Sequence, residues 1–201
     1  MAVGIKTAYL KINDKVIELD HSYLGVAKAD IKGMQGNLTN INGSNRIQYT
    51  YAEPSKPTMT LTVNRAGEKL ISQLTGETKA GKSSSLFVEG GRLPLVGVAV
   101  VTANIGGDKD YMVVFDKARA VVQSLSLSTN TDSKKTVVAD QITFNANYSD
   151  NIGGTVAKGD IPVDGAAQEL QALGWAEPTT GNGDFSDDAV AAKPVADPSH
   201  S

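Results

Sequence analysis

The sequence has no cysteine in its 201 residues. A disulfide framework and a thiolate metal site are therefore both impossible, so packing and strand pairing must stabilise the fold. Histidine is almost as scarce, since His21 and His200 are the only two. A Ser-His-Asp, Cys-His or histidine-metal centre has too few parts to be built. We therefore predict a protein that is not an enzyme, with no catalytic residues, no metal site and no cofactor.

The chain also lacks a basic excess and a long apolar run. Its formal net charge of -3 does not favour tight binding to phosphates or anionic lipids. The longest apolar stretch, residues 93–103, contains Pro94 and Gly97 and is too short to span a bilayer. Lys6 and Lys11 lie where a signal peptide would need its apolar segment. We expect no membrane insertion and synthesis in the cytoplasm.

Aromatic residues are few, at 5% of the chain, whereas glycine contributes 20 residues. Together with abundant Thr, Ser, Val and Asn in the middle of the chain, this composition favours strands and turns over helices. A chain of this length can bury one sizeable core. We expect residues 1–176 to form one β domain. Residues 177–201, rich in Pro, Gly, Asp, Ala and Ser, are expected to be a flexible tail.

Period-two patterns predict the strands. The clearest is residues 57–63, where Met59, Leu61 and Val63 alternate with threonines. The last long pattern should turn alternate side chains towards the core: Ile142, Phe144, Ala146 and Tyr148. Its other face is uncharged, which is uncommon for a solvated strand and suits a covered surface: Gln141, Thr143, Asn145 and Asn147. Further strands are expected at residues 7–12, 16–19, 26–31, 93–104, 110–115, 120–128 and 136–148.

Helical periodicity is confined to two short segments. Leu70, Ile71 and Leu74 share one face of a helix predicted over residues 65–74, which Asn64 would cap. That helix should pack its apolar face on a sheet. A second helix is predicted over residues 166–173, with Asp164 as its cap.

Residues 32–56 have no strong periodicity and are rich in Gly and Asn at the start and Pro at the end. A segment of that length is usually a functional projection or disordered. A strand-like stretch at residues 46–51 favours an ordered, projecting arm. A long surface loop without a partner is the alternative.

Residues 76–83 read GETKAGKS and match the phosphate-binding pattern G-x-x-x-x-G-K-[ST]. That loop works only between a buried strand and a helix whose N-terminus meets the phosphates. Here a helical pattern precedes the loop, so we expect a chance match. Asp108, Asp110 and Asp116 cluster near a predicted hairpin, but their spacing is not that of a calcium loop. We expect them to be solvated turn carboxylates.

The order of these features resembles the major tail (tail tube) proteins of long-tailed, siphovirus-type bacteriophages. The resemblance rests on an extended N-terminal strand (MAVGIKTAYLKI), a long loop before a Thr-rich strand (AEPSKPTMTLTV), a short amphipathic helix (RAGEKLISQL) and a late strand (ADQITFNANYSD). It implies a mainly β fold, an antiparallel β-sandwich or partial barrel with one flanking α-helix, a long projecting loop at residues 32–56 and extended terminal arms.

The resemblance also implies a virion protein that forms stacked hexameric rings, the tail tube through which DNA is ejected. Its implied partners are copies of itself, the tape measure and tail-end proteins, and phage DNA passing non-specifically. The family has no catalytic residues to carry over. Another non-enzymatic virion or surface β module, such as a tail-end, capsid-decorating or adhesin-like protein, is the alternative.

The N-terminal strand, residues 2–12, combines strand propensity with two lysines that we expect to be unpaired. Lysines of this kind guard open sheet edges. We therefore expect this strand to add to the sheet of another subunit. Residues 177–201 have no such capacity.

Overall fold

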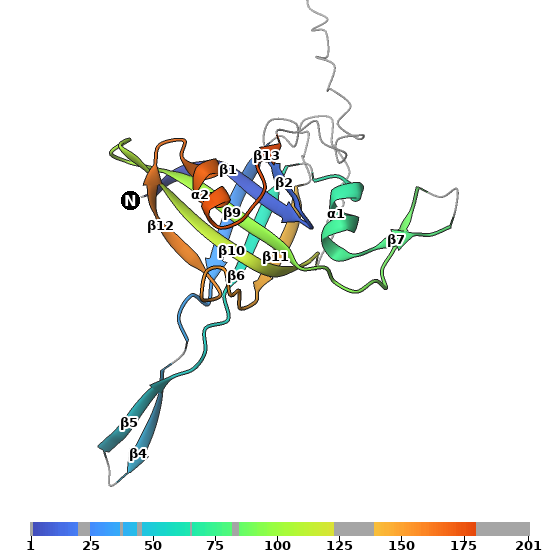
Figure 1. The fold of residues 1–201 in the computed structure, drawn as a ribbon. Helices are drawn as coiled ribbons and strands as arrows, with labels where there is room; N and C mark the ends of the chain where they lie inside the picture. The colour runs from blue at the N-terminus through green and yellow to red at the C-terminus, as the bar shows by residue number, and fades with distance from the viewer. Residues whose placement is uncertain are drawn as a thin grey trace, which may run out of the picture.

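A computed structural model describes residues 2–19, 25–36, 38–43, 46–64, 66–81, 85–122 and 139–179. Within these residues the chain is mainly β, mostly antiparallel and sandwich-like, without a closed barrel (Figure 1). The strands are β1 (Ala2–Ile12), β2 (Lys15–Glu18), β3 (Val26–Lys32), β4 (Leu38–Gly43), β5 (Arg46–Ala52), β6 (Thr58–Val63), β7 (Thr78–Lys79), β8 (Phe87–Val88), β9 (Val96–Asn104), β10 (Lys109–Val121), β11 (Asp140–Ala146), β12 (Ala157–Pro162) and β13 (Pro178–Thr179). The helices are α1 (Glu68–Thr75) and α2 (Ala166–Ala172).

One large sheet dominates the body, in the order β13-β2-β1-β9-β10-β11-β6-β3, with β12 also paired to β10. The long strand β10 joins its two halves. Its first part pairs with β9 and β12, and its last residues, from Ala118 to Val121, pair with β11. A register shift between Phe115 and Ala118 interrupts the β9 ladder, as a bulge that bends a strand does. The sheet therefore curls until β1 and β3 touch.

The main core lies inside this curl. Each strand contributes every second side chain, as the period of a strand requires. In β6, Met59, Leu61 and Val63 are fully buried, which confirms the predicted pattern. The helix α1 closes the core with Leu70, Ile71 and Leu74. Each large apolar side chain buried here stabilises the fold by about 1.5–3 kcal/mol relative to the exposed side chain.

A second, smaller core lies on the opposite face of β1, β9 and β10. The helix α2 and the Trp175 side chain cover it, and they pack on apolar side chains that include Tyr9, Ala99 and Met112. The body thus has two flanking helices, one on each core, rather than the single flanking helix of the expected fold class. Leu170 of α2 is fully buried, which explains how so short a helix is held.

Both predicted helix caps are wrong. The residue before α1 is Gly67 and the residue before α2 is Gly165, and neither helix has a side-chain cap. The Gly67 backbone has a φ of 77°, a conformation that glycine adopts readily. Asp164 instead has a φ of 58° and joins an ion pair. Beside these starts Ala66 and Ala166 are buried, and the Ala66 N–H donates to Asp140 at 2.9 Å, so packing accompanies the helix starts in place of a capping side chain.

Two expectations for strand faces also need correction. Tyr148 was expected to face the core but lies beyond the end of β11 and is 62% exposed. In β3, strict alternation over residues 26–31 predicts Val26, Lys28 and Asp30 on one face and Ala27, Ala29 and Ile31 on the other. Val26 and Ile31 nevertheless both pack on the core, because a register shift between Val26 and Lys28 interrupts the alternation. The parts of the predicted strands at residues 123–128 and 136–138 lie outside the described residues.

The N-terminal strand does not extend as a free arm. The strand β1 pairs with β9 from Ala2↔Asn104 to Ile12↔Val96, and with β2 over Tyr9–Ile12. Near the other terminus, Pro178 and Thr179, the second and third residues of the expected flexible tail, pair with β2. The rest of that tail, residues 180–201, lies outside the described residues.

Candidate assembly surfaces

A hairpin of β4 and β5 projects from the body (Figure 1). Two side-chain hydrogen bonds support its ladder: Thr50 donates to Asn40 at 2.7 Å and Thr39 donates to Glu53 at 3.2 Å. At the base, a Cβ on Gly36 would lie 1.5 Å from the Glu53 carbonyl oxygen, so only glycine allows the strands to approach this closely. The projecting arm was thus predicted, but β4 was not.

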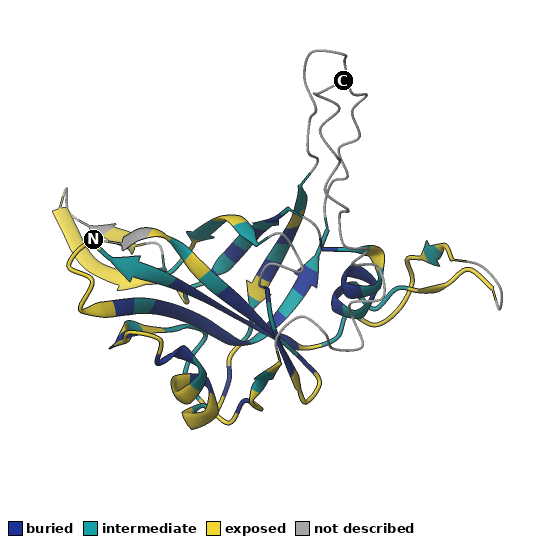
Figure 2. Cartoon of the chain, turned by 90° about the horizontal axis from the view of Figure 1, so that it is seen from above, coloured by how far each residue is buried: buried dark blue, intermediate teal, exposed yellow. Residues whose placement is uncertain are grey.

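The hairpin is largely exposed (Figure 2), and five of its exposed residues are large and apolar. Their exposed fractions range from 42% to 72%: Leu38, Ile41, Ile47, Tyr49 and Tyr51. A two-stranded hairpin alone is marginally stable in water, and contiguous exposed apolar patches mark interaction sites. The arm therefore has the properties of a protein interaction surface.

The phosphate-loop match falls on a second projecting loop, which carries β7 and β8. Its first glycine, Gly76, is the C-cap of α1, with a left-handed φ of 76°. A helix C-terminus presents carbonyl oxygens and negative partial charge. A phosphate-binding loop needs the opposite end of a helix. Lys82 and Ser83 lie outside the described residues.

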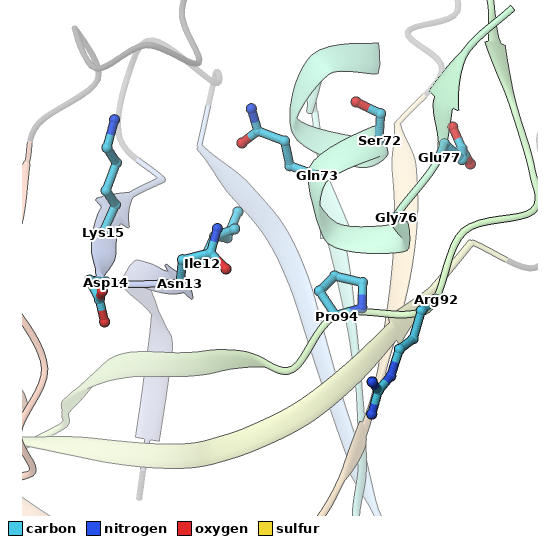
Figure 3. A pocket seen from close by; sticks show the side chains of 10 residues that line it. All are labelled: Ile12, Asn13, Asp14, Lys15, Ser72, Gln73, Gly76, Glu77, Arg92 and Pro94. Atoms are coloured by element: carbon cyan, nitrogen blue, oxygen red, sulfur yellow. The ribbon is translucent and has the colours of Figure 1, made fainter.

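A cleft of about 630 Å³ separates the β1–β2 turn from α1 and the segment after β8 (Figure 3). The turn is the tight Asn13-Asp14 hairpin loop, in which Asn13 has a left-handed φ of 54°. Gln73 points from α1 towards this turn. In the described part of the chain, its Oε1 atom is buried and accepts no hydrogen bond. Sequence patterns gave no sign of this cleft, because its walls are distant in the sequence.

A polar, uncharged strip covers the outer face of β6 and β11. The two strands are antiparallel neighbours, and their threonines meet across the ladder, with Thr60 and Thr143 hydroxyls 3.1 Å apart. The side chains are half-buried or exposed: Thr58, Thr60, Thr62, Gln141, Thr143 and Asn145. The sequence predicted this outward face.

A buried carboxylate, Asp116, holds the second core together. It accepts hydrogen bonds from Ser149, from Asn151 at 3.1 Å and from the Trp175 indole at 2.7 Å. The Lys11 ammonium lies 3.3 Å from Asp116 and 5.4 Å from the centre of the Trp175 ring. Asp116 is therefore not the solvated turn carboxylate that its sequence position suggested.

A second ionic cluster ties β1 to β10. The Lys6 ammonium lies 2.8 Å from Asp110 and 2.7 Å from Asp164. Asp110 is almost fully buried and also accepts the Asp164 backbone N–H. The expectations that Asp110 is solvated and that Lys6 and Lys11 are unpaired are both wrong. Sequence reasoning missed these pairs because their partners lie about a hundred residues away.

These contacts shift the acidity of both carboxyls. The Lys6 hydrogen bond holds the pKa of Asp110 below its ordinary value, despite burial, which acts in the opposite sense. For Asp116, burial would raise the pKa, but hydrogen bonds from Ser149 and Trp175, with the Lys11 charge, outweigh burial and lower it. Both groups are therefore ionised at neutral pH. In the described residues, no group of three or more His, Asp or Glu side chains is placed to hold a metal ion.

Comparison with known families places this architecture in a structural class of virion components. A family model described as phage tail tube protein matches residues 2–160. The chain belongs to the phage tail tube protein family, whose members are structural parts of the virion tail rather than enzymes. A comparison with curated proteins found no match. Among the described residues, no helix is long and apolar enough to cross a membrane.

Proposed function

We propose that this chain assembles with itself into hexameric rings, which stack into the hollow tail tube of a long-tailed, siphovirus-type phage. In this role it needs no catalytic residue, metal or cofactor. The tube would conduct DNA during ejection, and its other partners would be the tape measure and tail-end proteins. Family membership supports the structural role, and the projecting hairpin supports self-assembly.

The observation that carries the proposal is the apolar hairpin of β4 and β5. In an isolated monomer, the five large apolar side chains exposed on this arm contribute no burial energy to the stability of the fold. If a neighbouring copy covers them, burial contributes about 25 cal/mol per Å² of apolar surface. Because each subunit of a stack engages several neighbours, modest contacts add to a stable assembly.

Surface charge and polarity support passage of DNA. The chain has a formal net charge of -3, and a lining of that sign repels phosphates and so lets a duplex slide. The uncharged strip on β6 and β11 suits either the lumen or a contact between subunits. The side chains named for this strip include no lysine or arginine, so it has no basic patch that would hold DNA in place.

Shortening the hairpin tests the proposal. Replacing residues 34–55 with a short Gly-Ser linker keeps Lys32 and Thr58, the paired ends of β3 and β6. Shortening a surface loop costs little closure entropy, so the variant should fold, with an unchanged far-UV circular dichroism spectrum. Unlike the full chain, it should not pellet as tubes on sedimentation.

Negative-stain images of the concentrated full chain provide the control. Six-fold rings or tubes are expected from the full chain and single subunits from the shortened one. A shortened chain that pellets like the full chain would show that the hairpin does not join subunits. A full chain that forms neither rings nor tubes would contradict self-assembly itself.

A further inference from the structure

The hairpin and the cleft lie at opposite ends of one pair of strands. The hairpin leaves where β3 ends and β6 begins, at the paired residues Lys32 and Thr58. The other end of this pair is Val26 opposite Val63, and α1 begins shortly after Val63. Figure 1 shows the hairpin at the bottom of the body and α1 at its upper right. Copies aligned end to end would therefore bring an arm towards a cleft.

One residue that lines the cleft has an unpaired acceptor. A buried amide oxygen without a hydrogen bond costs free energy, and Gln73 has such an oxygen, Oε1, enclosed within the described part of the subunit. Around it lie Ile12 and Pro94, which are apolar, and charged groups that include Asp14 and Arg92. The cleft volume of about 630 Å³ is enough for several side chains.

The hairpin has side chains that complement those of the cleft. Its exposed Ile41 and Ile47 suit the apolar wall of the cleft, and the hydroxyls of Tyr49 and Tyr51 are hydrogen-bond donors on large apolar rings. Arg46 begins β5 and is exposed, and the cleft is lined by two carboxylates, Asp14 and Glu77, and by two cations, Lys15 and Arg92. Apolar area and hydrogen-bond donors therefore lie on the same arm, together with a cation that can pair with either carboxylate.

We propose that the cleft between the β1–β2 turn and α1 receives the β4–β5 hairpin of a second copy of this chain. The contact is heterologous, because an arm meets a cleft rather than another arm, and between subunits of successive rings it can continue from copy to copy along the stack. The inference rests on the proposed self-assembly and names the acceptor surface.

Cross-linking tests the pairing directly, since the chain has no cysteine of its own. A double variant, Asp14→Cys with Ile47→Cys, places one thiol at the cleft and one on the hairpin, both at exposed positions. A short bismaleimide applied to assembled protein should give a ladder of trimers and longer products on a denaturing gel. Each single variant can give dimers at most.

A matched control moves the cleft thiol elsewhere. Lys158 is exposed on β12, away from the cleft, so Lys158→Cys with Ile47→Cys should give no ladder. The inference is overturned if tubes form and the Asp14 pair gives only dimers, or if the Lys158 pair gives the ladder. If the full chain never assembles, both the proposed function and this inference are contradicted. If tubes form without the cross-linked ladder, only this inference is contradicted.

A second variant tests the orphan acceptor. Gln73→Leu keeps the size of the side chain and removes the unpaired oxygen, so the free subunit should be at least as stable in urea. Because this oxygen is buried in the free subunit, a hairpin of another copy donates to it only when docking turns the Gln73 amide towards the cleft. In that case the threshold concentration for assembly of Gln73→Leu should rise about five-fold, the loss of one hydrogen bond. An unchanged threshold would contradict the assigned contact.

Discussion

At the residue scale, Asp116 links parts of the chain that are far apart in sequence. Its donors come from β1, from the turn after β11 and from the segment after α2. Removing the whole carboxylate would leave the buried Ser149 and Trp175 donors without this acceptor, which costs more than the bond itself contributes. The carboxylate therefore fixes how α2 covers the second core.

We expect acid to weaken the fold through Asp110 and Asp116. Both have pKa values below the ordinary value of about 3.9, so below that pH the unfolded chain binds more protons than the folded one. Their contribution to the free energy of unfolding is complete above about pH 4 to 5 and is lost as the pH falls through the folded pKa values. Urea unfolding at a series of pH values measures this.

The control compares two neutralised carboxyls. Asp116→Asn should be less stable at neutral pH and show a shallower loss in acid, because one titrating group is gone. Asp150→Asn, at a carboxyl whose side chain is 88% exposed, should follow the unmodified chain. Equal acid slopes for all three proteins would contradict the role of Asp116.

The contact between Gly97 and Trp175 gives a second prediction. A Cβ on Gly97 would lie 2.6 Å from the indole ring, so Gly97→Ala must displace it. We expect a loss of about 1–3 kcal/mol in the free energy of unfolding. Since Trp175 is the only tryptophan, its fluorescence should shift to the red.

Gly159 on β12 is the matched control, because a Cβ there meets nothing within 4 Å. Gly159→Ala should leave both the emission and the stability nearly unchanged. If Gly97→Ala has no larger effect than Gly159→Ala, the packing of Trp175 against β9 is not as described.

At the element scale, the loop with β7 and β8 gives a third prediction. Because Gly76 ends a helix there instead of beginning one, ATP should not raise the melting temperature. Lys82→Ala should leave fold and assembly intact. Saturable ATP binding by calorimetry that Lys82→Ala abolishes would contradict this.

Local patterns predicted some elements and not others. The alternation of Met59, Leu61 and Val63 marks β6 because the core requires that period. The strand β4 could not be predicted from its own sequence, because a Gly- and Asn-rich stretch has low strand propensity. Its pairing with β5 stabilises it. The predicted helix caps are wrong because a glycine, which has no side chain to cap a helix, precedes each helix in place of Asn64 or Asp164.

Of the candidate surfaces, too, some could be predicted from local sequence and others could not. The arm at residues 32–56 was predictable, since its length and composition are local properties. The cleft was not, because Ile12 and Gln73 meet only after the sheet has curled. The ion pair of Lys11 with Asp116 spans more than a hundred residues and leaves no spacing for a pattern to detect.

At the scale of the whole molecule, the two termini should respond differently to truncation. Removing residues 2–8 deletes the β1–β9 pairs up to Val100 and the Lys6 ion pairs. An N-terminal strand that only joined subunits would give a stable monomer on truncation, whereas these contacts predict an unstable subunit. Removing residues 180–201 leaves the β13 contact with β2 and should leave polymerisation intact. Sedimentation and urea unfolding of both variants test this. A chain without residues 180–201 that cannot pellet would show that these residues take part in polymerisation. A chain without residues 2–8 that keeps its urea midpoint would show that these residues do not stabilise the subunit.

The opposite placement of arm and cleft makes any stack of these subunits directional. One end of the tube would always present hairpins and the other empty clefts, so the two ends grow at different rates and recruit different proteins. An initiator at the tip and a terminator at the far end would then need different surfaces, one shaped as a cleft and the other as a hairpin. Tail length could be controlled at one end without disturbing attachment at the other.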